Sequence, residues 1–110
     1  MTVKELLELD EFEAVNIDDD SRIIKGGYCG DLLSWVMGRA EEDNVFVTIM
    51  VNVNVIAVAS LINVSCVVIC ENAELSDELI NAAKQKEINL IKTPLASFEA
   101  CACLSNLINA

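Results

Sequence analysis

Residues 45–70 read VFVTIMVNVNVIAVASLINVSCVVIC, an apolar stretch without a charged side chain. A membrane-spanning helix needs about 20 predominantly apolar residues, so the length alone would allow one. Three asparagines and two serines divide this stretch, however, and acidic residues flank it at 41–43 and at Glu71. The cytoplasmic flank of a membrane helix carries Lys and Arg instead. We therefore predict a strand, a helix and a second strand that are buried inside a water-soluble protein, with no membrane partner.

The three elements of this stretch can be bounded from its polar residues. Val45–Met50 is a predicted strand of the kind found in the middle of a parallel sheet, and Cys66–Cys70 is the next strand. Asn54 is the predicted N-cap of a helix over Val55–Ile62. This helix is apolar on nearly all sides, which indicates that neighbouring elements enclose it or that it lies at an oligomer contact.

Outward from this stretch, helix and strand signals alternate. Before it, Thr2 and Glu5 form a capping box, Glu13–Ile17 is a predicted strand, and Arg22–Cys29 is extended. Asp31 is the predicted cap of a helix that includes residues 32–37. The elements predicted after the stretch are a helix over Asp77–Glu87 capped by Ser76, a strand over Leu90–Lys92, and a last helix with Thr93 as N-cap and Pro94 at its first position.

The alternation of elements from Asp31 onward determines the predicted fold class. Helices and strands that follow one another in this way form a parallel sheet with helices on both faces. We predict an α/β fold, a single three-layer domain over residues 1–110 with a mainly parallel sheet flanked by helices. Hydrophobic residues make up 54% of the 110, enough for one core.

Charge and cysteine content limit the possible partners. The chain carries 18 acidic against 7 basic residues, a formal net charge of −11, which disfavours binding to nucleic acid and to anionic membrane surfaces. Its five cysteines are odd in number and form no CxxC pair, and there is no histidine, so we predict no metal site and no cofactor. We interpret the cysteines as small buried side chains in a reducing cytoplasm. Met1–Asp10 is charged and amphipathic and does not read as a signal peptide.

Catalytic motifs are absent from the sequence. There is no GxxxxGK[ST] phosphate loop, no GxSxG and no HExxH, and the lack of histidine excludes Ser-His and Cys-His nucleophile pairs. Arg22, Lys25, Tyr28 and Asp31 could form a polar cluster, but no reaction can be assigned to them. We therefore predict that the protein is not an enzyme.

The most informative motif is SRIIKGGYCGDLLS at residues 21–34. Adjacent glycines at 26 and 27 allow the close approach of another backbone or of a ligand, where a Cβ would clash. A bulge or a crossing of strands that needs glycine is the structural alternative. An anion bound ahead of the following helix would meet the carboxylate of Asp31, which weakens a phosphate-binding interpretation.

This motif resembles the signature of the DRTGG domain family. Arg22, Gly26 and Gly27 match, whereas Ser21 stands for the Asp and Lys25 for the Thr. Further similarities are Thr48-Ile49, Asn54, the AVASL at 57–61, Thr93-Pro94-Leu95 and Phe98-Glu99. The resemblance implies a fold similar to the N-terminal domain of HPr kinase. It also implies an accessory or dimer-forming role, as in CBS-pair pyrophosphatases and phosphotransacetylases.

Two functions follow from these observations. The first is a non-catalytic regulatory or scaffold module that forms a homodimer. The second is a small-molecule sensor, in which a ligand such as a nucleotide binds beyond the carboxyl ends of the parallel strands. Candidate ligand-binding residues are Arg22, Lys25, Gly26, Gly27, Tyr28, Asp31, Asn52, Asn54, Glu71, Thr93 and Pro94. Those at strand ends could equally be helix caps and turn residues.

Overall fold

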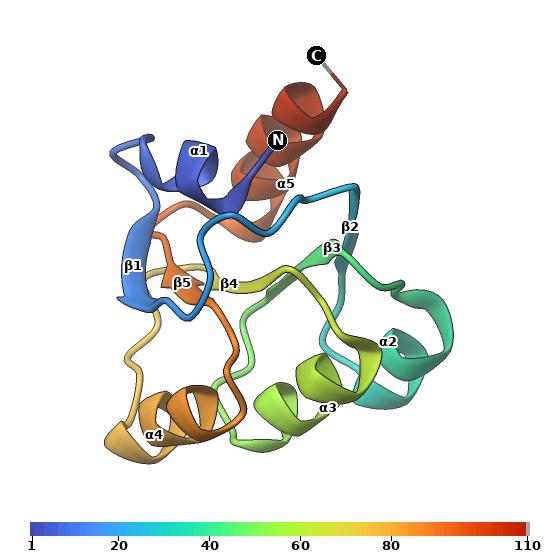
Figure 1. Cartoon of the computed structure of the whole chain (residues 1–110), viewed down its shortest axis with the longest axis vertical. Coiled ribbons are helices and arrows are strands. Elements are labelled where there is room, and N and C mark those ends of the chain that lie inside the picture. Colours follow the sequence, from blue (N-terminus) through green and yellow to red (C-terminus); the bar gives the residue numbers. More distant parts are fainter. Residues whose placement is uncertain (110) are drawn as a thin grey trace.

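A computed structural model describes residues 1–109, in which five strands form one sheet with helices on both faces (Figure 1). In chain order the elements are α1 (Val3–Leu7), β1 (Glu13–Asn16), β2 (Gly26–Cys29), α2 (Leu33–Arg39), β3 (Asn44–Thr48), α3 (Asn54–Ile62), β4 (Cys66–Ile69), α4 (Asp77–Gln85), β5 (Leu90–Lys92) and α5 (Ser97–Ile108). The predicted strand, helix and strand of residues 45–70 are confirmed. No helix within residues 1–109 is long and apolar enough to cross a membrane.

The sheet has the strand order β1-β5-β4-β3-β2. Strands β2 to β5 are parallel, and β1 is antiparallel to β5. Each of α2, α3 and α4 connects neighbouring parallel strands, and all three crossovers step in the same direction. Right-handed crossovers then place these helices on one face, and α1 and α5 cover the other. The order of the parallel strands never reverses, so their carboxyl edge lacks the crevice at which ligands bind in doubly wound folds.

Alternating side chains divide the core between the two faces. Phe46, Val67 and Leu90 pack under α2, α3 and α4, while Val45 and Ile91 pack under α1 and α5. Every residue of β3 and β4 is buried, as expected of central strands covered on both sides. The predicted α/β class with a mainly parallel sheet is confirmed.

The apolar helix α3 is enclosed by its neighbours. Val55, Ile56, Val58 and Ala59 are buried, and α2 and α4 pack on its two sides. Leu61 is the large apolar side chain of α3 that remains exposed, at 72%. Of the two explanations for this apolar helix, enclosure within the fold accounts for most of its surface.

Two helices begin at the N-cap residues that the sequence predicts. Thr2 and Glu5 form the capping box of α1, and the Ser76 hydroxyl accepts a hydrogen bond from the Leu79 N–H of α4 at 3.2 Å. These caps depend on residues three apart in the chain, so the sequence is enough to identify them.

Three other predicted caps are wrong. The N-cap residues of α2, α3 and α5 are Leu32, Val53 and Ala96, and none of them makes a side-chain capping bond. The last helix therefore begins after Thr93 and Pro94 instead of at them.

Two of the side chains expected to cap these helices, those of Asp31 and Thr93, have other partners. The Asp31 carboxylate accepts hydrogen bonds from the Thr48 hydroxyl at 2.9 Å and the Ile49 N–H at 3.2 Å, across to the next strand. Thr93 is fully buried, and its hydroxyl accepts from the Leu95 N–H at 3.2 Å. A contact with the end of β3 and a local turn therefore replace two of the three predicted caps.

Candidate functional site

The eleven candidate residues lie in three places, and the structure does not bring them together in one site. Arg22 and Lys25 are at the amino ends of the parallel strands, and Gly26, Gly27 and Tyr28 belong to β2 itself. The remaining six follow the carboxyl ends of the strands: Asp31, Asn52, Asn54, Glu71, Thr93 and Pro94.

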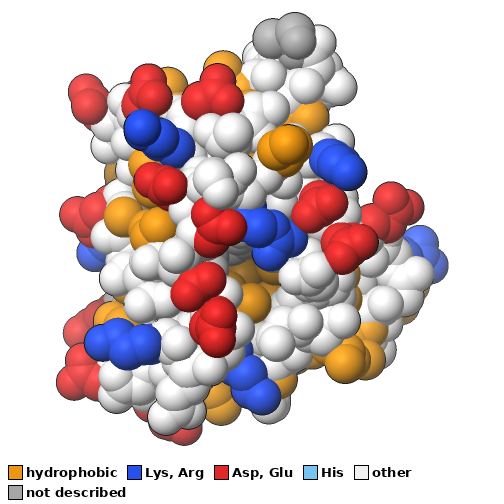
Figure 2. Space-filling model, in the orientation of Figure 1, with side chains coloured by type: hydrophobic (Ala, Val, Ile, Leu, Met, Phe, Trp, Pro, Cys, Tyr) orange, Lys and Arg blue, Asp and Glu red, His pale blue; other side chains and the backbone are white. Residues whose placement is uncertain are grey.

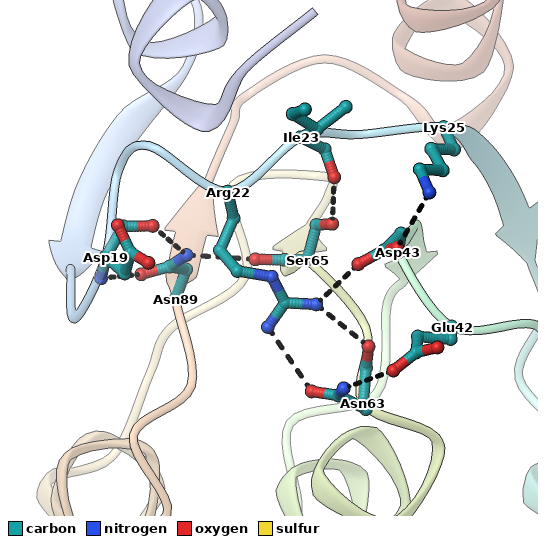
Figure 3. Close-up of polar contacts among 9 residues, drawn as sticks. All are labelled: Asp19, Arg22, Ile23, Lys25, Glu42, Asp43, Asn63, Ser65 and Asn89. Atoms are coloured by element: carbon teal, nitrogen blue, oxygen red, sulfur yellow. Dashed lines mark hydrogen bonds and ion pairs between the residues drawn. The ribbon is translucent and has the colours of Figure 1, made fainter.

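Arg22 holds the segment that crosses the amino ends of the strands. Residues 17–25 connect β1, at one edge of the sheet, with β2 at the other edge. The guanidinium donates to the Asp43 carboxylate at 2.9 Å and to the carbonyl and side-chain oxygens of Asn63 at 3.0 and 3.3 Å (Figure 3). The hydrogen bond from Arg22 and the positive charge of its guanidinium hold the pKa of Asp43 below its usual value. Lys25, whose Nζ lies 3.6 Å from Asp43 Oδ2, adds to this effect.

Asn89 forms the second half of this amino-end network. It is only 4% exposed, and its side-chain N–H groups donate to the carbonyl oxygens of Asp19 and Ser65 at 2.8 and 2.9 Å. Its side-chain oxygen accepts from the backbone N–H groups of Asp18 and Asp19 at 2.8 and 3.0 Å. The Ser65 hydroxyl donates to the Ile23 carbonyl nearby (Figure 3). One buried amide thus connects the crossing segment to the starts of β4 and β5.

Sequence reasoning did not identify Asn89, Asp43, Asn63 or Ser65. A signal existed for Asn89 alone, because an amide between Ile88 and Leu90 is unusual at the start of a buried strand. Since the guanidinium of Arg22 makes three hydrogen bonds within the chain, the geometry supports a structural role for this residue.

The two glycines lie in a regular strand and not in a turn. Neither has a positive φ, and a Cβ added to Gly27 would lie 3.1 Å from Val45 Cγ1. At Gly26 an added Cβ would lie 3.3 Å from Asn44 Nδ2. The close approach expected at these positions is therefore made by the side chains of β3.

A pocket of about 320 Å³ lies between β2, β3 and the carboxyl-terminal half of α5. It is at the lower end of the size range of small-molecule sites. Four candidate residues line it, namely Lys25, Gly26, Gly27 and Tyr28. The remaining lining residues are Cys29, Val45, Val47, Cys101, Leu104, Ser105, Ile108 and Asn109. The sequence did not identify the contribution of α5, because it depends on where the last helix crosses the sheet.

The cysteines differ in their exposure, and all five are free. Cys66 and Cys70 are buried as predicted, and burial raises the pKa of their thiols to about 12 and about 11. The prediction is wrong for Cys29, which is exposed on β2, and Cys101 and Cys103 are half-buried. Partial burial and a hydrogen bond with Cys101 raise the pKa of Cys29 to about 11, so its thiol is protonated at neutral pH.

Polar groups at the carboxyl ends bond within their own turns or to a neighbouring loop or strand end. The Asn52 side chain accepts from the Asn54 N–H at 2.9 Å. Glu71 and Asn72 both adopt left-handed backbone, with φ of 64° and 53°, and their N–H groups donate to the carbonyls of the loop after β5. These contacts favour the interpretation of the carboxyl-end candidates as turn residues. Within residues 1–109, no three His, Cys, Asp or Glu side chains are grouped to hold a metal ion.

Comparison with known proteins gives a match at the level of structure. The chain is similar to the crystal structure of the CBS and DRTGG domains of the regulatory region of Clostridium perfringens pyrophosphatase, in complex with the activator diadenosine tetraphosphate. The TM-score is 0.76 at 23% sequence identity, over 97% of this chain and 45% of that chain. The fold is DRTGG-like. No family model and no curated protein matches the sequence.

The DRTGG-like fold confirms what the motif at residues 21–34 predicted about architecture. The matched region spans less than half of the neighbouring chain, which also holds CBS domains. In this protein the motif residues have different tasks: Arg22 anchors the crossing segment, and the glycines pack β2 against β3.

Proposed function

We propose that this protein is a non-catalytic regulatory module that works as a homodimer in the cytoplasm. The observation that carries the proposal is the DRTGG-like fold, which extends over 97% of the chain and matches part of a regulatory region. The absence of histidine and of catalytic motifs from the sequence agrees with a module that controls another activity.

Exposed apolar side chains support self-association. Leu32, Trp35 and Met37, in and just before α2, are 59%, 54% and 49% exposed. The guanidinium of Arg39 lies over the Trp35 ring, 4.0 Å from its centroid, and leaves about half of that residue open. Exposed apolar side chains grouped on one helix are typical of interaction surfaces.

Sedimentation velocity tests the homodimer. Across concentrations from low micromolar to about 0.2 mM, we expect the mass to rise from that of the 12.0 kDa chain to twice that value. A species that keeps the monomer mass at the highest concentration would contradict the proposal.

A second candidate function is small-molecule sensing, favoured by the pocket beside β2. Its floor of Val45, Val47 and Leu104 is apolar, and Lys25 is the one cationic side chain among its lining residues. The neighbouring structure contains a nucleotide activator, which makes nucleotides the first compounds to test. With a net charge of −11 and one lysine, the pocket suits a ligand that carries few negative charges.

Thermal unfolding with adenosine, AMP, ATP and diadenosine tetraphosphate tests this second function. A ligand that binds only the folded chain raises Tm as its concentration increases. We expect the largest rise with a compound of low charge and a smaller one in the Lys25→Met variant. No rise with any of these compounds would contradict nucleotide sensing.

A further inference from the structure

Strand β2 ends the sheet and has no strand neighbour on its outer side. The strand order places β3 on one side of it and nothing within residues 1–109 on the other (Figure 1). Natural proteins protect such edges with proline, bulges or inward-pointing charges. The four residues of β2 are Gly-Gly-Tyr-Cys, and none of these devices is present among them.

The backbone groups of β2 that remain free can be assigned. The Gly30 N–H donates to the Val47 carbonyl of β3 at 3.1 Å, Cys29 is the residue opposite Val47, and pairing alternates along the parallel ladder. The N–H and C=O groups of Tyr28 therefore point toward β3, and those of Gly27 and Cys29 point away from the sheet. They are available to another strand.

The charges that flank β2 are self-complementary. Lys25 precedes the strand and Asp31 follows it, each three residues from Tyr28. If two copies of β2 pair antiparallel about a two-fold axis at Tyr28, Lys25 of each copy lies opposite Asp31 of the other. Registers centred on Gly27 or on Cys29 also pair outward-pointing groups, and they place Lys25 opposite Cys29 or Leu33, without any charge pair.

We propose that a second copy of this chain pairs with β2 in the register centred on Tyr28, so that the two sheets form one continuous sheet. This inference rests on the proposed homodimer and specifies its interface. Charge complementarity selects a second copy as the occupant, because the same strand supplies both the cation and the anion. The Lys25 side chain is 68% exposed and its ion pair with Asp43 is long, at 3.6 Å, so Lys25 can reach a second partner.

The helix beside β2 adds apolar surface to the same interface. Helix α2 follows β2 in the chain, packs on β2 and α3, and is the outermost helix of its layer. Pairing at the strand edge brings α2 of each copy next to the other copy. This arrangement covers part of the apolar surface that Leu32, Trp35 and Met37 expose. The charge-paired edge also offsets part of the repulsion between two chains of charge −11.

An exchange of charges tests the register. In Lys25→Glu alone, two like-charge pairs face each other across the axis, and the same holds for Asp31→Lys alone. We expect each variant to associate about tenfold more weakly than the wild type. An equimolar mixture of the two restores both opposite-charge pairs in a mixed dimer. Sedimentation of the mixture is expected to return to the wild-type dimer fraction, and no recovery would overturn the register.

Asp31→Lys also removes the carboxylate that binds Thr48 and Ile49, so the edge needs a test that leaves Asp31 intact. Cys29→Pro removes one outward N–H, which edge strands tolerate because that N–H has no partner in the sheet. Cys29→Ala is the matched control, since it loses the same thiol but keeps the N–H. We expect Cys29→Pro to associate at least about tenfold more weakly than Cys29→Ala, with equal thermal unfolding of the two.

The outcomes separate this interface from the proposed function. A dimer that persists unchanged in both Lys25→Glu and Cys29→Pro overturns the interface and leaves the homodimer standing. A wild-type chain that stays monomeric overturns both. Loss of association with Leu61→Ser, an exposed apolar position on the middle helix α3, together with no loss for Trp35→Ser, would place the contact elsewhere and overturn the interface.

Discussion

The amino and carboxyl ends of the parallel strands are built differently. At the amino ends, Asn89 and Arg22 bind residues 21 to 71 positions away, through backbone and side-chain partners. At the carboxyl ends, the side chains of Asn52 and Thr93 accept hydrogen bonds from N–H groups two residues further on. Asp31 is the exception there, since its partners Thr48 and Ile49 lie 17 and 18 positions away. Long-range bonds hold the fold together, whereas local bonds shape single turns.

The amino ends of the strands therefore matter most for the stability of the fold, and the carboxyl ends for the exposed surface. The amino-end network ties the crossing segment to three strands, so its loss affects the whole sheet. The carboxyl end leaves Ile49 and Val51 exposed at 45% and 38%, and Phe98 in the first turn of α5 at 82%. Acidic side chains are spread over the face seen in Figure 2, with fewer basic ones among them. Changes at the carboxyl end are expected to alter contacts with other molecules more than folding.

The largest effect is expected at Asn89. Asn89→Ala leaves the backbone groups of Asp18, Asp19 and Ser65 without their buried partner, and we expect it to lower the free energy of unfolding by about 3 kcal/mol. Urea unfolding measures this loss. Asn81→Ala, at an exposed position of α4, is the matched control and should be nearly neutral. Equal effects of the two substitutions would contradict the importance of the network.

An intermediate effect is expected from acid. Because the Arg22 hydrogen bond lowers the pKa of Asp43 in the folded chain, this contact stabilises the fold above the pKa of an unfolded Asp, about 3.9. The stabilisation is lost as the pH falls through the lower folded value.

Urea unfolding at pH 7 and at about pH 3 checks this dependence. Asp43→Asn lacks the titrating group, so we expect it to lose less stability between the two pH values than the wild type. It should still lose some, since hydrogen bonds lower the pKa of Glu5 and Asp19 as well. Identical losses in variant and wild type would show that Asp43 does not contribute.

The smallest effect is expected for the same substitution at the opposite end. Asn52→Ala removes one exposed hydrogen bond to the Asn54 N–H, and we expect a change in unfolding free energy within about 0.5 kcal/mol. Compared directly with Asn89→Ala by urea unfolding, it measures how unequal the two ends are. A destabilisation as large as that of Asn89→Ala would remove the distinction between them.

The sequence by itself determined the class of fold. Two buried strands around an apolar helix, the capping box at Thr2 and the cap at Ser76 depend on residues near one another in the chain, and all are present. Hydrophobic periodicity and capping are local, which is why they can be predicted without coordinates.

Only the tertiary structure decided what the candidate residues do. Asp31 binds Thr48 on the next strand instead of capping α2, and Arg22 reaches across to Asp43 and Asn63. The pocket beside β2 forms because α5 crosses the far face of the sheet. These contacts depend on strand order and register, which arise from the packing of distant segments and leave no local pattern in the chain.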